Sequence, residues 1–181
     1  MDKDSFIKTF WKNYNLLEKD FLTTDEYVSV SKSNYKTFSA RYTSLFLNIC
    51  SEMDSLAGYY CKALNCEGNL NNIVKKITEI LQDNPKLKDM KCVTIFPYEI
   101  IYVVPFQGFS EESSAGWWQD YNKVKHFRAD IPEVGIPNYQ LANLKNVMLA
   151  LSALFILSVS LYEKLDGEIN YKPESKLFRI E

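Results

Sequence analysis

The sequence predicts a mainly α-helical protein with a small β appendage, built as a bundle of four to five helices. Apolar side chains recur at three- and four-residue spacing along most of the chain, which is the periodicity of an amphipathic helix. Residues 147–162 form a sixteen-residue stretch without a charged side chain, which is typical of a helix buried in a core. Residues 92–104 are rich in the β-branched and aromatic residues that favour strands. The length of 181 residues predicts one domain, residues 1–181.

Five segments carry the helical pattern. They are Ser5–Phe21, Tyr35–Leu64, Leu70–Leu81, a helix that starts within Ser110–Ser114 and continues to Arg128, and Asn138–Leu165. We expect Gly68 to end the second helical region, Asn69 to cap the third helix and Asn138 to cap the last. The charge-free part of the last helix is shorter than the roughly 20 residues that a membrane span needs. A core helix is therefore expected there, and no membrane association.

Two short segments, Cys92–Phe96 and Glu99–Val104, predict a β-hairpin that turns at Pro97 and Tyr98. This hairpin is an insertion in the helical pattern, near residues 92–104. Near the C-terminus, residues 176–180 alternate polar and apolar side chains, which predicts an edge strand. Residues 26–31 are also β-prone, although the segment is short.

Charge and cysteine content limit the classes of function. A formal net charge of −2 excludes a broad basic face for coating nucleic acid but leaves room for a local basic patch. The four cysteines form no C-x-x-C pair and there is one histidine, so no metal site and no cofactor is predicted. The first four residues lack the apolar segment of a signal peptide. Free thiols without an export signal predict a cytoplasmic protein.

The segment 116–128 concentrates the residues with functional potential. It holds the only histidine of the chain, two of its three tryptophans, and several cations. On a helix, Trp117, Tyr121, Val124 and Arg128 would share one stripe, and Trp118, Asn122, Lys125 and His126 the neighbouring one. Histidine is the side chain type that exchanges a proton near neutral pH. His126 is therefore the central candidate, either as a functional group or as a structural residue at the edge of the core.

A second candidate is Glu52, in the long helical segment 35–64. Helical geometry places it close to the apolar stripe formed by Leu45, Ile49 and Leu56. A carboxylate that faces inward needs a cation or several donors, because its burial alone costs several kcal/mol. Lys125, His126 and Arg128 are the expected partners. The alternatives are that Glu52 bends outward to water or forms a purely structural ion pair.

The order of these features resembles a known family. A long helix with an inward acid (SLFLNICSEMDSLAGYYC) precedes a Pro-Phe lead-in, the motif W-W-x-x-Y-N-x-x-K-H-x-R, and an Asn-started helix containing LANLKNVMLALSALF. This pattern resembles bacterial proteins of the HEPN type, small helical bundles of toxin–antitoxin, phage-defence and RNA-processing systems. The resemblance covers roughly residues 35–165, without the β insertion. It implies a homodimer or a protein partner, and a role with RNA.

HEPN ribonucleases carry an Arg four to six residues before the His, often followed by a polar residue, and cut RNA without a metal. His126 and Asn122 match the His and the polar residue. The Arg does not match: Tyr121 stands at its place, and no Arg lies between Arg41 and His126. A lysine does not replace this Arg, because its ammonium lacks the planar pair of donors with which a guanidinium binds a phosphate.

Two functions are therefore expected. One is a degenerate HEPN-like module that docks a partner through a polar network of Asn122, His126, Arg128 and Glu52. The alternative is a metal-independent endoribonuclease that uses His126, with Asn122 as a positioning group and Lys125 or Arg128 for charge. Trp117 or Trp118, if exposed, would then stack on a base.

Overall fold

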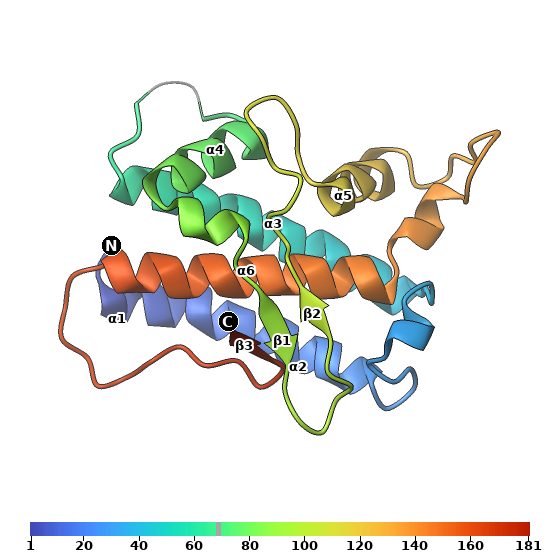
Figure 1. Ribbon diagram of the computed structural model, residues 1–181, viewed down its shortest axis with the longest axis horizontal. Helices are drawn as coiled ribbons and strands as arrows, with labels where there is room; N and C mark the ends of the chain where they lie inside the picture. Colours follow the sequence, from blue (N-terminus) through green and yellow to red (C-terminus); the bar gives the residue numbers. More distant parts are fainter. Residues whose placement is uncertain (68–69) are drawn as a thin grey trace.

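The computed structural model describes residues 1–67 and 70–181, and it confirms a mainly α-helical fold with a small sheet (Figure 1). Within these residues, the helices are α1 (Lys3–Phe6), α2 (Lys12–Thr24), α3 (Ala40–Ala63), α4 (Ile73–Asp83), α5 (Gly116–His126) and α6 (Leu144–Lys164). A π-helical turn, η1 (Ile7–Trp11), joins α1 and α2 into one continuous rod. The sheet contains β1 (Cys92–Thr94), β2 (Tyr102–Val103) and β3 (Phe178–Ile180).

Helix α6 is the central element of the core. It packs along α3 more extensively than any other two elements pack, and it also contacts α2 and α5. Figure 1 shows α6 lying between α3 and the N-terminal rod. By length and composition α6 could cross a bilayer, but 83% of its most apolar window is buried inside the protein. The predicted core helix is therefore present, apolar nearly all round because other helices surround it.

The long helix α3 ends at Ala63, next to the predicted end at Leu64, but it begins at Ala40 rather than at Tyr35. Asn65 adopts a left-handed φ of 55°. Its N–H donates to the Lys62 carbonyl at 3.1 Å, and the next N–H, of Cys66, donates to the Cys61 carbonyl at 3.0 Å. This pair of bonds is a Schellman motif, which satisfies carbonyls that a helix end leaves free. Gly68, which was expected to end this helical region, lies outside the described residues. Asn65 is the left-handed residue that ends α3.

Several predicted helix starts are also corrected. Helix α4 begins after Asn72, whose side chain accepts from the Lys75 N–H at 3.0 Å; Asn69, the expected cap, lies outside the described residues. Helix α6 begins after Asn143, not Asn138, because residues 138–141 form a separate 3-10 turn. In both places the observed cap is an asparagine that lies later in the sequence than the expected one.

Two further expectations near loops are wrong. Helix α5 begins at Gly116, and residues 110–114 form a loop with a turn in which the Ser110 N–H donates to the Ser113 carbonyl. The β-prone residues 26–31 form turns rather than a strand. There the Asp25 carboxylate accepts from the Val30 N–H at 2.7 Å, and a side-chain acceptor of this kind favours a turn over a sheet ladder.

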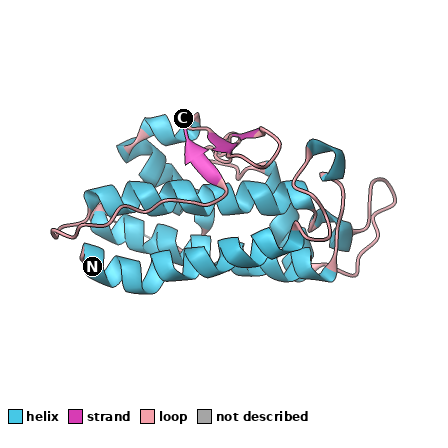
Figure 2. Cartoon of the chain, turned by 90° about the horizontal axis from the view of Figure 1, so that it is seen from below, coloured by secondary structure: helices cyan, strands magenta, loops and turns pink. Residues whose placement is uncertain are grey.

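The sheet confirms the predicted hairpin and the predicted C-terminal strand. β1 is central and pairs antiparallel with both neighbours, in the order β2-β1-β3. Cys92 lies opposite Val103 on one side and Ile180 on the other. Figure 2 shows the small sheet on one side of the helical layer.

A buried carboxylate fixes the C-terminal segment that leads into β3. Glu18 on α2 is 2% exposed. It accepts hydrogen bonds from the Tyr14 hydroxyl at 2.8 Å, the Ser175 hydroxyl, the Lys176 N–H at 3.0 Å and the Leu177 N–H at 3.3 Å. Four donors compensate for the lost hydration of a buried charge. Glu18 thus attaches the last strand to the first long helix.

Removal of this acceptor should destabilise the fold. Glu18→Ala leaves several buried donors unpaired, so we expect a loss on the order of 3 kcal/mol in the free energy of unfolding, measured by urea denaturation. Glu26→Ala, at an exposed position shortly after α2, is the matched control and should change little. A Glu18→Ala variant as stable as the control would show that the carboxylate does not hold the segment.

Candidate functional site

The aromatic residues of α5 belong to the core. Trp117 and Trp118 are each 5% exposed and Tyr121 is 4% exposed. The Trp117 indole N–H donates to the Pro105 carbonyl at 2.7 Å, so the Pro-Phe lead-in anchors the helix. Tyr121 packs edge-on against Phe46 of α3, with ring centroids 5.9 Å apart. The tryptophans are therefore not available to stack on a base, which corrects that part of the expectation.

The opposite face of α5 is open to solvent. Asn122, Lys123, Lys125 and His126 are exposed, and none of the described residues forms a hydrogen bond with the side chain of Asn122 or His126. The Lys125 ammonium lies 5.5 Å from the centroid of the Tyr121 ring, a cation–π distance. Burial, with smaller effects of Cys50 and Asp54, raises the pKa of Tyr121 to about 12. The Lys125 ammonium at the end of α5 thus packs against the Tyr121 ring, and the Tyr121 hydroxyl stays neutral at physiological pH.

Arg128 lies beyond the helix, contrary to the predicted continuous stripe. The backbone leaves the helix at Phe127, with φ −134° and ψ 36°. Asn138 holds this exit, since its side-chain N–H donates to the Phe127 carbonyl at 2.9 Å. The Arg128 Nε donates to the Val124 carbonyl at 3.5 Å. The guanidinium is consequently displaced from the face that carries His126 and Asn122.

Glu52 does not join this group. It is half-buried on α3, and Asn13 on α2 is the polar side chain beside it. Burial raises the pKa of Glu52, and the hydrogen bond with Asn13 partly offsets that rise. In the described chain, no ion pair joins Glu52 to Lys125, His126 or Arg128. The expected internal network of Asn122, His126, Arg128 and Glu52 is therefore not formed, because Glu52 lies on the side of α3 that faces α2.

A different polar bridge positions α5. The Asn146 side chain on α6 is 7% exposed. It donates to the Asp120 carboxylate at 3.1 Å and to the Leu141 carbonyl at 2.9 Å. Asp120 also pairs with Lys123 at 3.3 Å. The sequence offered a signal for this bridge, since a buried asparagine at the start of a core helix needs a partner, but it did not identify that partner.

Arg128 lines a small pocket that the sequence did not reveal. The pocket has a volume of about 330 Å³, and its walls come from the start of α3, the turn at residue 139 and Arg128. Phe38 and Tyr139 are each 41% exposed and lie edge-to-face with centroids 5.6 Å apart. These two aromatics are distant in sequence and are joined through the Phe38–Asn143 β-bridge. We define the α5-end surface as Lys125, His126, Arg128, Phe38 and Tyr139.

The described residues contain no group of three or more His, Cys, Asp and Glu side chains arranged to hold a metal ion. The α5-end surface offers donors, cations and aromatic faces instead. No family model, no curated protein and no solved structure matches the chain.

The environment of Glu52 makes stability depend on pH in a defined direction. Its folded-state pKa is raised above the usual 4.5, so the cost of the buried charge is present above the folded pKa and disappears below the unfolded pKa. Glu52→Gln should therefore stabilise the protein by about 1 kcal/mol or less at about pH 7, and have no effect near pH 3.5.

Urea unfolding at both pH values measures this difference. Glu112→Gln serves as the control: it removes a charge at an exposed loop position, where the charge is hydrated and carries no burial cost. A Glu52→Gln variant less stable than the parent at neutral pH would mean that the carboxylate has a cationic partner after all.

Proposed function

We propose that this chain is a degenerate HEPN-like module that binds single-stranded RNA through the α5-end surface and does not cut it. The observation that carries the proposal is the exposed pair Phe38 and Tyr139, whose pocket Arg128 also lines, together with the exposed cation Lys125 near the end of α5. Single-stranded nucleic acids are bound by this combination, in which bases stack on aromatic faces and cations contact the phosphates. The resemblance to HEPN proteins supports a cytoplasmic role in bacterial toxin–antitoxin or phage-defence systems.

The charge distribution supports local rather than general binding of RNA. The whole chain carries a net charge of −2, so long-range attraction to phosphate is weak. Lys125 and Arg128 form no ion pair with any described residue, and their charges are available to a ligand. An RNA contact through these two cations predicts a slope of about −1.4 for log K against log salt concentration.

The same end of the molecule supports a homodimer. Exposed apolar side chains gather in the loop after α5, where Phe127 is 58%, Ile131 74% and Val134 91% exposed. Such a cluster is typical of a protein contact. Asp130 and Glu133 are exposed in this loop too and form no ion pair within the described chain. A two-fold contact through this loop would cover these apolar side chains and leave Lys125 and Arg128 available to RNA.

Endoribonuclease activity is the alternative, and the exposure of His126 favours it. The geometry opposes it in two respects. Tyr121, at the place of the missing Arg, is buried and points into the core. Arg128 lies beyond the helix end and bonds to the Val124 carbonyl. The Arg128 guanidinium, which is bonded to the Val124 carbonyl, therefore does not take the place of the motif Arg in stabilising the charge that develops on the phosphate.

RNA binding should depend on the aromatic pocket. We expect Arg128→Ala and Tyr139→Ala each to weaken binding of a fluorescein-labelled single-stranded RNA about tenfold, since each removes a phosphate contact or a stacking face. Fluorescence polarisation at several salt concentrations measures this. Lys86→Ala, an exposed lysine of η3 (Pro85–Lys88), is the control and should bind like the parent. Equal binding by all four proteins would exclude this pocket as the RNA site.

The purified protein should not cleave RNA in EDTA. The reason is the missing motif Arg, without which the transition state lacks its bidentate partner. Gel analysis of a labelled RNA, with His126→Ala prepared in parallel, provides the measurement. Cleavage by the parent and not by His126→Ala would overturn the proposal in favour of a metal-independent ribonuclease.

A further inference from the structure

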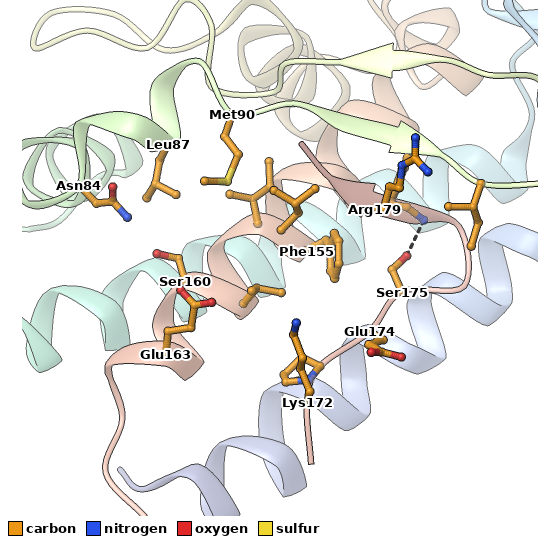
Figure 3. Close-up of a pocket in the computed structure, with 16 residues that line it drawn as sticks. Asn84, Leu87, Met90, Phe155, Ser160, Glu163, Lys172, Glu174, Ser175 and Arg179 are labelled. Carbon is orange, nitrogen blue, oxygen red and sulfur yellow. Dashed lines mark hydrogen bonds between the residues drawn. The ribbon is translucent and has the colours of Figure 1, made fainter. Parts of the chain in front are cut away.

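A second pocket lies between α6, η3 and the C-terminal segment, and the α5-end surface contributes nothing to it (Figure 3). Its volume is about 470 Å³, which is within the range of small-molecule sites. Its floor is apolar and comes from elements far apart in sequence. The floor residues are Leu87, Met90, Ile95, Phe155, Ile156, Val159, Phe178 and Ile180. A ligand that fits this floor carries an extended apolar body.

The wall of the pocket is held in place before any ligand binds. Residues 172–175 form one side of it. The Tyr171 carbonyl accepts from the Tyr162 hydroxyl at 2.6 Å, and the Trp11 indole N–H donates to the Tyr171 hydroxyl at 2.6 Å. At the other end of the segment, Glu18 binds residues 175–177. A preformed wall lowers the entropy lost on binding.

One cation faces the apolar floor. Figure 3 shows the Lys172 ammonium directed from the C-terminal segment toward Phe155. Lys172 forms no ion pair with any residue that the structure describes, whereas Arg179 is bonded to Glu181 at 2.8 Å. Glu163 and Glu174 also line the rim. These two acids disfavour a ligand with several negative charges, whereas the unpaired Lys172 ammonium can pair with one anionic group.

We propose that this pocket binds a medium-chain fatty acid, with its carboxylate on the Lys172 ammonium and its alkyl chain on the apolar floor. Each buried methylene contributes to affinity through the hydrophobic effect, and the charge-assisted hydrogen bond fixes the orientation of the chain. The proposal is independent of RNA binding, because it uses other residues.

Methionine methyl NMR tests the proposal on the whole chain. The sequence has four methionines. Met90 lines the pocket, whereas Met53 and Met148 are fully buried in the main core and Met1 is at the N-terminus. With ¹³C-methyl methionine, titration of decanoate should shift the Met90 signal and leave the other three unchanged. Butyrate, with the same head and a short chain, should produce no shift.

Two lysines of one segment provide matched variants. Lys172→Met removes the proposed carboxylate partner, while Lys176→Met changes a lysine that contributes only its backbone N–H to Glu18. We expect Lys172→Met to weaken decanoate binding about tenfold, and Lys176→Met to bind like the parent. Decanol should bind the parent about tenfold more weakly than decanoate does, and should bind Lys172→Met and the parent equally.

Each of several results would overturn the proposal. These are an unchanged Met90 signal at the solubility limit of decanoate, equal binding of decanol and decanoate by the parent, and undiminished binding by Lys172→Met. Glu163→Gln gives a further check, since removal of the rim charge should tighten decanoate binding; weaker binding would place the carboxylate elsewhere.

Discussion

Three hydrogen bonds to the buried Glu18 carboxylate, from Ser175, Lys176 and Leu177, attach the C-terminal segment to the first long helix. The segment then supplies β3, which pairs with β1 and completes the small sheet. It also forms one wall of the pocket that contains Lys172. A buried charge is tolerated here because several donors surround it. The position of the sheet and the shape of that pocket therefore depend on one side chain of α2.

Helix α5 is organised by the contrast between its two faces. Trp117, Trp118 and Tyr121 bury one face against the core, and the Asp120–Asn146 hydrogen bond fixes the helix on α6. This rigid base leaves Asn122, Lys125 and His126 on the solvent side. A surface presented by a fixed helix is better suited to binding than one on a mobile loop. The loop that follows α5 carries further exposed apolar side chains, among them Phe127, Ile131 and Val134.

The two proposed sites use different chemistry on different parts of the molecule. The α5-end surface combines aromatic rings with cations, which suits a polyanion with stacking bases. The other pocket combines an apolar floor with a single unpaired lysine and two acids, which suits a monoanion with an apolar chain. The two sites share no lining residue, so each can be altered without a direct effect on the other.

The sequence by itself determined the helical class, the hairpin, the C-terminal strand and the central position of the charge-free helix, because periodicity and β-propensity are local properties. It also identified the segment of α5 whose exposed face carries His126. Only the tertiary structure decided that Glu52 faces Asn13 on α2, that Arg128 lies past the helix end, and that Phe38 meets Tyr139. It also selected Asn143 over Asn138 as the cap of α6. Each of these depends on contacts between residues that are distant in sequence. Helical geometry predicts the face of the helix on which a side chain lies, but it does not predict which element packs against that face.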